Sequence, residues 1–551
     1  MFLHNFWSKL KSTSVVKLYI TIALIGICDF IYFLKTQQYS LAILGVLACM
    51  SLLFLPIFLF KNHIKLYLRL LLPIFILLPL NFGSTIIYGI PINDSIIYLI
   101  LNTNFQEATE LLSGYLFIII ISIIIYVVAL FILFSKIPNT IPSKTSYYLS
   151  SISLFILLLL PLFDKETKAY FSNLRARLYT TFPISLVYAS KITYAQYQLA
   201  RSSKDERENF KFNAKQDINI DDKQVSVLII GESSRYDHWA INGYSKNTSP
   251  RLSKRENLIS FKNVTTGGFI TEYAVPLILT GVGADSFNKH YQQKSIVSAF
   301  EEAGFSTYWL TTQVDEGHIS IHIKEAQKQY TLVSDSRATK NVHRDMELLT
   351  PLKKILATPD KKKFIVLHTN GSHYDYSVRY PDEFDVFKPS NKTVTSASAD
   401  KRFKNVLVNS YDNSILYSDA VIDSVISLVS SQNAYSFVTY ISDHGENLFD
   451  DNRNLSQHAY PIPSKYVAHI PYFIWYSPLL EKTFSNKITN LKSNINAKIS
   501  SKSVIHTLTS LGGISYSRQD SSKNLASPYY KDSKQLILGA NNKAYFSPNL
   551  K

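Results

Sequence analysis

Residues 225–232 read VSVLIIGE, a short run of β-branched and apolar residues that ends at Gly231 and is followed directly by Glu232. A run of this length, closed by a glycine, is typical of a buried strand. Similar runs occur at Phe364–Leu367 and Ser436–Ile441, separated by segments long enough for helices. Strands that alternate with helical segments predict an α/β domain with a mostly parallel central sheet covered by helices on both faces.

In such a sheet, polar sites gather just beyond the carboxyl ends of the strands. Glu232 follows the first run, and Asp443 and His444 follow the run that ends at Ile441. Taken alone, Glu232 is more commonly a helix-start residue, and a single Asp-His pair is a weak signal. Two strand ends with acidic residues in one domain are a stronger signal of a metal site, because zinc accepts this mixture of carboxylate and imidazole ligands.

A third segment, residues 265–276, reads TTGGFITEYAVP and pairs two glycines with a hydroxyl and a proline. This pattern predicts a tight backbone approach that leads into a helix. The hydroxyl of Thr271 would then lie near helix N–H groups that can receive an anion. The alternative is that Thr271 is only an N-cap, which is the better interpretation for this residue in isolation.

The first 163 residues have a different character, because nearly all the long apolar runs fall there. The stretches that are long and apolar enough to cross a hydrocarbon core of roughly 30 Å are Val15–Leu34, Ser40–Phe60, Leu66–Phe82, Tyr115–Phe134 and Tyr147–Phe163. These five stretches predict a five-helix transmembrane domain over residues 1–163.

Lys and Arg mark the cytoplasmic loops of membrane proteins. They occur before the first stretch, between the second and third, and between the fourth and fifth, whereas Gly83–Gly114 carries acidic residues but neither Lys nor Arg. We therefore expect a cytoplasmic N-terminus and a large domain, residues 221–551, outside the cytoplasm. In the connector, 164–220, Pro183–Leu199 is expected to form an interfacial helix or a plain tether, and Arg201–Lys215 a solvated linker.

The formal charge of +16 would suit nucleic acid, but an exported domain meets none. An anionic membrane surface or a phosphorylated glycolipid is the partner that this charge favours, alongside simple solubility. Cys28 and Cys49 are the two cysteines, and both fall in predicted spans. Residues 221–551 therefore fold without disulfides, although we expect an oxidising compartment.

These segments occur together and in order, and with their neighbours they resemble the phosphoethanolamine transferases, membrane-anchored members of the alkaline-phosphatase (sulfatase-like) superfamily in bacterial inner membranes. The resemblance is carried by Gly231-Glu232 with Arg235, Asn242–Tyr244, Ser260–Val264, Thr271 with Val275-Pro276, His368 with Gly371–His373, Arg379–Pro381, Tyr411–Asn413, Ser442–Glu446, His458, and Pro471 with Trp475. It covers nearly the whole chain, including the five spans and the connector.

The resemblance implies a periplasmic, zinc-dependent catalytic domain with an alkaline-phosphatase-like fold. The residues that would ligate one tightly bound zinc ion are Glu232, Thr271, Asp443 and His444. Thr271 would also be the nucleophile, because metal coordination activates an otherwise poor hydroxyl, and would carry phosphoethanolamine during turnover. His373 and His458 would lie around the phosphoryl group or a second metal, with His373 as a candidate general acid.

The implied donor is phosphatidylethanolamine, and Thr103 and Glu107 match positions thought to contact its headgroup. The implied acceptor is lipopolysaccharide, at its core or lipid A, or another periplasmic glycan, and the protein is expected to act as a monomer. One feature departs from the family, because Gly267 and Leu277 replace the cysteines that flank the nucleophile in many members. That favours an acceptor other than lipid A.

Other functions stay open at this point. A glycerol-phosphate polymer synthase of the lipoteichoic acid synthase type shares the five spans, the threonine and the Asp-His pair. An inactive membrane-anchored scaffold is a second alternative, which the intact set around Thr271 disfavours. A sulfatase activity is disfavoured because no Cys-x-Pro-x-Arg or Ser-x-Pro-x-Arg site surrounds Thr271.

Overall fold

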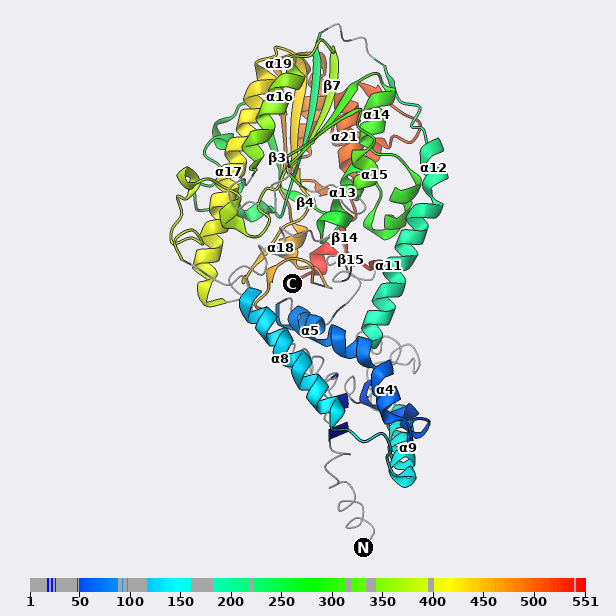
Figure 1. Ribbon diagram of the computed structural model, residues 1–551. Coiled ribbons are helices and arrows are strands. Elements are labelled where there is room, and N and C mark those ends of the chain that lie inside the picture. The colour runs from blue at the N-terminus through cyan, green and yellow to red at the C-terminus, as the bar shows by residue number, and fades with distance from the viewer. Residues whose placement is uncertain are drawn as a thin grey trace. The chain divides into compact units, whose positions relative to one another are not determined.

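The computed structural model describes residues 17, 18, 21, 22, 25, 47, 49–87, 92, 97, 116–159, 182–217, 220, 222–313, 319–332, 343–394, 401–460, 462–539 and 542–551. The chain divides into two compact units. Unit 1 comprises Met1–Leu101 and Leu112–Ala195, and unit 2 comprises Asn102–Leu111 and Gln196–Lys551. Both are shown in Figure 1.

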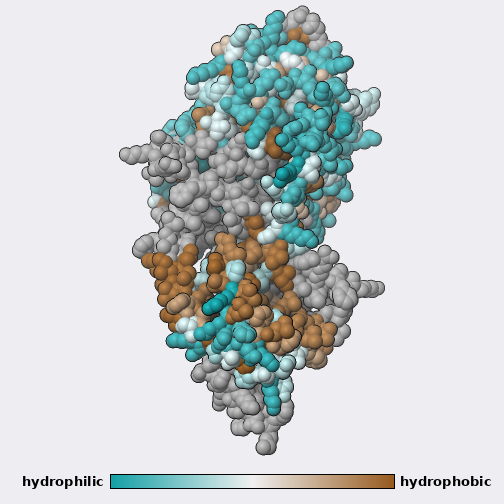
Figure 2. All heavy atoms as spheres, turned by 45° about the vertical axis from the view of Figure 1, so that its right-hand side comes forward, coloured by the Kyte–Doolittle hydropathy of each residue, from teal (hydrophilic) through white to brown (hydrophobic). Residues whose placement is uncertain are grey.

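Unit 1 is built from apolar helices. Their bounds are α4 (Ile64–Leu70), α5 (Leu72–Ile87), α8 (Leu116–Ser135), α9 (Ser143–Leu159) and most of α11 (Ile184–Ser202). In α8 the large side chains of Ile125 and Phe131 are 63% and 76% exposed. Apolar residues gather on the visible face of unit 1, whereas hydrophilic residues cover most of the coloured surface of unit 2 (Figure 2).

The five predicted spans are only partly represented among the described residues. Searched there, no single helix combines the length and the apolar composition that a bilayer crossing needs, while the bent pair Ile64–Leu70 and Leu72–Thr85 meets both together at an angle of 47°. Most of the first predicted span, Val15–Leu34, lies outside the described residues, as do Thr103 and Glu107.

Unit 2 is organised around a mixed seven-stranded sheet of order β3-β11-β8-β2-β7-β5-β6. The strands are β3 (Leu258–Phe261), β11 (Tyr472–Tyr476), β8 (Tyr435–Ser442), β2 (Gln224–Gly231), β7 (Lys362–His368), β5 (Ser306–Thr311) and β6 (Lys328–Thr331). The strands from β8 to β6 pair in parallel, and β11 runs antiparallel to both of its neighbours. The three strands expected from the sequence are confirmed as β2, β7 and β8, which are adjacent at the centre.

Helices cover both faces of this sheet (Figure 1). One apolar core lies under α16 (Leu349–Leu356) and α17 (Lys404–Ser430). The other lies under α13 (Thr271–Thr280), α14 (Ile296–Glu302) and α21 (Ser503–Leu511). Because β2 is buried along its whole length on both faces, its segment Val227–Ile230 is continuously apolar and does not alternate.

Shorter elements complete unit 2. The helices are α12 (Lys204–Asn209), α15 (Ser320–Ile323), α18 (Lys465–Ala468), α19 (Pro478–Thr483) and α20 (Ser485–Ser493). The two-stranded pairs are β1 (Lys215–Gln216) with β13 (Ile514–Ser515), β9 (Asn447–Leu448) with β10 (Ser456–Gln457), β4 (Asn263–Thr265) with β12 (Lys498–Ser500), and β14 (Leu536–Leu538) with β15 (Ala544–Phe546).

The expectation of a solvated linker at Arg201–Lys215 was wrong. The segment contains α12, and Phe212 and Ala214 are buried at 3% and 5% exposure. The Glu302 carboxylate accepts hydrogen bonds from the backbone N–H groups of both residues, at 3.0 Å each. Although the segment is mostly charged, the buried side chains of Phe212 and Ala214 pack into the core of unit 2 and hold the segment there.

Candidate active site

The site lies at the carboxyl ends of the central strands. In the parallel register Gly231 of β2 is level with Ser442 of β8, and Ile230 is level with His368 of β7. Glu232 and the Asp443-His444 pair therefore leave neighbouring strands at the same edge. All three side chains are buried, at 1% exposure or less.

Thr271 is the first residue of α13 and is not its N-cap, which is Ile270 in an extended conformation. Its hydroxyl Oγ1 lies 3.0 Å from Glu232 Oε2 and 3.4 Å from His444 Nε2. The helix therefore presents this side chain to the acidic strand ends. The N-cap interpretation, which was preferred for the residue in isolation, was wrong.

Glu232, Asp443 and His444 offer ligand atoms that all lie within 4.8 Å of one another. Asp443 Oδ1 accepts hydrogen bonds from the backbone N–H groups of Ser233, at 3.0 Å, and His444, at 2.6 Å. Asp443 Oδ2 is buried and has no hydrogen-bond partner among the described residues. A buried oxygen without a donor is costly, and a cation at this position would satisfy it.

The imidazole of His444 is oriented by its other nitrogen. His444 Nδ1 lies 2.9 Å from the carbonyl oxygen of Gly445, to which it donates in the tautomer that leaves Nε2 unprotonated. His444 Nε2 is 3.3 Å from Asp443 Oδ2 and 3.6 Å from Glu232 Oε1. Two carboxylates, a neutral imidazole and a hydroxyl form a donor set that fits zinc.

The pKa of Asp443 also favours a cation at this site. Burial raises the pKa of Asp443 to about 7, although hydrogen bonds to its carboxylate partly oppose the shift. A buried carboxylate that resists ionisation is stabilised in its charged form by a cation. Metal binding at this edge would therefore release a proton.

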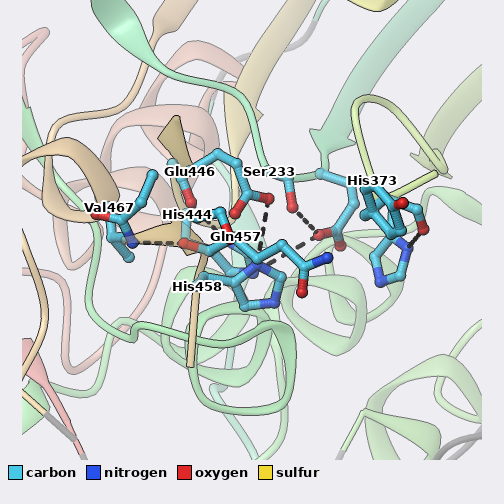
Figure 3. Close-up of polar contacts among 12 residues, drawn as sticks. Ser233, His373, His444, Glu446, Gln457, His458 and Val467 are labelled. Carbon is cyan, nitrogen blue, oxygen red and sulfur yellow. Dashed lines mark hydrogen bonds and ion pairs between the residues drawn. The ribbon is translucent and has the colours of Figure 1, made fainter. Parts of the chain in front are cut away.

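His373 and His458 lie around the same centre. The rings of His444 and His458 are 4.0 Å apart, and those of His373 and His458 are 6.4 Å apart, measured between centroids. In Figure 3 His458 lies beside His444 and Glu446, whereas His373 approaches from the opposite side. Burial lowers the pKa of His373 to about 4, and burial, followed by repulsion from the His444 ring whenever that ring is protonated, lowers the pKa of His458 well below its ordinary range.

Gly371 allows the loop that carries His373 to approach Glu232, a candidate metal ligand. Its φ is +47°, and a Cβ atom there would lie 2.8 Å from both N and O of Glu232. Asp345, which the sequence did not suggest, accepts hydrogen bonds from the N–H groups of Asn370 and Gly371, at 2.9 Å each. The loop is thereby fixed against the end of β2.

Gln313, which the sequence did not suggest, supports Glu232 directly, and Tyr411, from the Tyr411–Asn413 motif, supports the backbone that follows Glu232. Gln313 Nε2 donates to Glu232 Oε2 at 3.1 Å and to the Thr369 carbonyl oxygen at 2.7 Å. The Tyr411 hydroxyl donates to the Ser233 carbonyl oxygen at 2.7 Å and accepts from the backbone N–H of Arg235 at 2.9 Å. Gln313 follows the end of β5 closely, so the strand-end rule would have found it once that strand was recognised.

Gly267 and Leu277, the positions that replace family cysteines, lie against each other. An ideal Cβ on Gly267 would be 3.1 Å from Leu277 Cβ and 2.7 Å from Leu277 Cδ1. Since Cβ atoms joined by a disulfide are usually about 3.5–4.5 Å apart, the backbone has nearly the geometry that a disulfide between these two positions would need. In this chain Leu277, packed against Gly267, stands where a disulfide between the two positions would lie.

Comparison with known proteins agrees with this fold. The sulfatase family matches residues 224–514. Phosphoethanolamine transferase EptC of Escherichia coli strain K12 is 27% identical over 511 residues, covering 88% of this chain and 87% of the relative. The crystal structure of the C-terminal periplasmic domain of Escherichia coli EptC in complex with Zn is 26% identical, with a TM-score of 0.54 over 61% of this chain and 96% of that one.

A likeness to a longer structure extends beyond unit 2. The integral membrane protein lipooligosaccharide phosphoethanolamine transferase A, EptA, from Neisseria meningitidis has a TM-score of 0.76. The match covers 93% of this chain and 98% of that one at 21% identity, and so concerns the fold. The match over residues 224–514 decides the classification: this chain belongs to the sulfatase family, and the relatives it resembles there are phosphoethanolamine transferases.

Proposed function

We propose that this protein transfers phosphoethanolamine from phosphatidylethanolamine to lipopolysaccharide or another periplasmic glycan, through a phospho-threonine intermediate on Thr271. The observation that carries the proposal is the hydroxyl of Thr271 between Glu232 Oε2 and His444 Nε2, at 3.0 and 3.4 Å. The similarity to EptC supports the choice of phosphoethanolamine as the transferred group.

Glu232, Thr271, Asp443 and His444 would hold one zinc ion. When bound, zinc would lower the pKa of the threonine hydroxyl and offset the negative charge on the phosphoryl oxygens. Asp443 Oδ2, buried without a hydrogen-bond partner among the described residues, supports this assignment. The zinc complex of the Escherichia coli EptC domain supports the choice of metal.

In the first half-reaction Thr271 Oγ1 attacks the phosphorus of the donor. Glu232 Oε2 is placed to accept the hydroxyl proton, and the bond from phosphorus to the diacylglycerol oxygen breaks. Diacylglycerol leaves with the proton that Glu232 received from Thr271. In the second half-reaction a hydroxyl of the acceptor attacks the same phosphorus, and Thr271 is released. Donor and acceptor therefore never need to be bound together.

His373 and His458 would face the phosphoryl group. The lowered pKa values of both groups keep the imidazoles neutral near pH 7. A neutral imidazole accepts a proton or ligates a second metal more readily than it acts as an acid. We therefore assign these residues to proton acceptance from the acceptor hydroxyl or to a second metal during turnover, in preference to protonation of diacylglycerol by His373.

The membrane location follows from the N-terminal sequence. We propose five spans over residues 1–163, a cytoplasmic N-terminus, and residues 221–551 in the periplasm of a bacterial inner membrane, joined by the connector 164–220. The exposed apolar side chains of α8 and the distribution of Lys and Arg between the loops support this arrangement. Contacts of Thr103 and Glu107 with the donor headgroup belong to the same proposal.

Mass spectrometry of lipopolysaccharide and periplasmic glycans tests the function. Cells that produce the wild-type chain should carry added phosphoethanolamine on one of these molecules, and Thr271→Ala should abolish the addition while the protein still reaches the membrane. Thr280→Ala is the matched control, since that hydroxyl lies at the other end of α13 and bonds to the Pro276 carbonyl oxygen. Transfer by the Thr271→Ala chain at the wild-type level would disprove the nucleophile.

A further inference from the structure

A cavity whose lining includes three lysines lies beside the loop that leads to Thr271. This pocket, of ≈ 90 Å³, is bounded by the residues that follow α13, the start of α21 and the approach to β14. We call it the lysine pocket and define it by Gly267, Asp285, Ser500, Lys502, Lys523 and Lys534. No residue of the metal cluster lines it.

Positive charge dominates the lysine pocket. Lys502 Nζ lies 3.8 Å from Asp285 Oδ1, a loose pairing of two half-exposed side chains. In the part of the chain that the structure describes, no carboxylate is within ion-pair distance of Lys523 or Lys534. A hydrogen bond from Ser522 and, from further away, the charge of Lys523 lower the pKa of the Asp520 carboxyl, which does not line the pocket. Three ammonium groups against one lining carboxylate favour an anionic ligand.

A buried hydroxyl in the same pocket lacks a partner. Ser500, the last residue of β12, is 5% exposed, and its Oγ has no hydrogen-bond partner among the described residues. α21 begins three residues later, at Ser503, without a side-chain cap. The positive end of a helix and its first N–H groups attract anions. A hydroxyl donor, an uncapped helix start and three lysines form a built site for phosphate oxygens.

Gly267 belongs both to the lining of the pocket and to the loop that leads to Thr271. A Cβ on this residue would lie 2.7 Å from Ser501 Oγ, so the glycine lets the loop pack against the start of α21. Gly267 precedes Thr271 by four residues, which bounds the separation of their Cα atoms at about 14 Å. The Gly267 carbonyl oxygen also accepts from the backbone N–H of Leu538, at 2.8 Å. One short loop therefore lines the lysine pocket at Gly267 and carries Thr271 at its other end.

We propose that the lysine pocket binds a phosphate group carried by the acceptor glycan. The inference rests on the proposed transferase function for the identity of the ligand, while the chemistry of the pocket itself calls for a phosphate monoester. Lys523 and Lys534 pair with the phosphate oxygens, and Ser500, a lining residue whose Oγ is buried without a partner among the described residues, can turn its hydroxyl toward one of them. A bound phosphate would hold the acceptor so that one of its hydroxyl groups reaches Thr271.

Binding is tested with the full-length, zinc-loaded protein in detergent by isothermal titration calorimetry. Glucose 1-phosphate, inorganic phosphate and glucose are the probes. The variant Lys523→Ala/Lys534→Ala should bind glucose 1-phosphate about a hundredfold more weakly than wild type, at roughly tenfold for each charged contact. The control Lys531→Ala/Lys543→Ala removes the same charge from exposed lysines outside the pocket and should bind like wild type.

The alternative outcomes overturn the proposal in different ways. Equal affinity of the two double variants for glucose 1-phosphate would show that the pocket is not the site. Binding of inorganic phosphate but not glucose 1-phosphate at the pocket would show a site for free anion and refute the acceptor role. Binding of glucose as tightly as glucose 1-phosphate would refute recognition through phosphate.

A kinetic experiment separates this inference from the proposed function. Donor alone should label Thr271 equally in the wild type and in Lys523→Ala/Lys534→Ala, as measured by intact mass. With lipopolysaccharide as acceptor, the variant should show a KM raised at least about tenfold, a difference that disappears when the lipopolysaccharide is dephosphorylated. Failure of Thr271 to label would count against the function, whereas normal labelling with an unchanged KM would count against the pocket.

Discussion

A disulfide should form beside Thr271, the proposed nucleophile, if residues 267 and 277 are both changed to cysteine. In Gly267→Cys/Leu277→Cys the leucine Cδ1 that would obstruct a Cβ on residue 267 is removed, and the two Cβ atoms start 3.1 Å apart. A relaxation of about 0.5 Å brings them into the range of ordinary disulfides. The φ of Gly267 is not left-handed, so a cysteine there adds no backbone strain. Ser501 Oγ, 2.7 Å from the new Cβ, must turn away.

The expected stabilisation by the disulfide follows from the length of the loop that it closes. A bridge around the eleven residues from 267 to 277 removes chain entropy worth about 2.8 kcal/mol at 25 °C in the unfolded state, less any strain. For a cooperative unit of roughly 330 residues, such a gain corresponds to a rise in Tm of about 4 °C. Both redox forms carry the cost of replacing buried Leu277, so the comparison of oxidised with reduced protein isolates the bridge.

Thiol titration and thermal unfolding of the purified full chain check this prediction. The wild type has two cysteines, so the double variant should show four thiols after reduction and two fewer after oxidation. The oxidised form should unfold at the higher temperature and retain its zinc. The single variant Leu277→Cys provides the control, with no intramolecular partner in this loop. Persistent free thiols under oxidising conditions, or a Tm lowered by the bridge, would refute the packing of α13 described above.

Three shorter predictions address the site and its support. Gly371→Ala should reduce zinc content and activity, because the new Cβ would lie 2.8 Å from backbone atoms of Glu232. The control Gly304→Ala also has a positive φ, but its Cβ would have no atom within 4 Å, so its zinc content should not change. Equal zinc content in the two variants would contradict this prediction. Asp443→Asn should fold but bind zinc more than about a hundredfold more weakly, as measured by elemental analysis against competing chelator, and an unchanged metal content would exclude this ligand. Burial raises the pKa of Asp419 to about 6 from roughly 3.9 in an unfolded chain, so about 3 kcal/mol of stability is present below pH 4 and is lost as the pH rises through 6. Asp419→Asn should flatten that part of the pH dependence of urea unfolding, and a profile parallel to wild type would show that the carboxyl does not titrate there.

Much of the catalytic fold could be predicted because its central strands are encoded locally. The runs that became β2, β7 and β8 are mostly apolar and end at glycine or polar residues, so both the strands and the polar residues that follow them were visible. The flanking segment Arg201–Lys215 was misjudged for the converse reason. Its charge is a local property, whereas the burial of Phe212 and Ala214 depends on a distant helix that supplies Glu302.

The sequence by itself determined the kinds of residue at the strand ends, because the strand signal and the polar residue after it lie within ten positions of each other. Only the tertiary structure decided which of these ends meet. Ser233 and Asp443, 210 residues apart, are joined by a hydrogen bond of 3.0 Å, and this depends on β2 and β8 being neighbours. The strand order results from packing of the whole core, and no local pattern records it. The same packing brings Thr271, a helix-start residue, to Glu232 and His444 as a candidate nucleophile, and it places Ser500 in the lining of the lysine pocket.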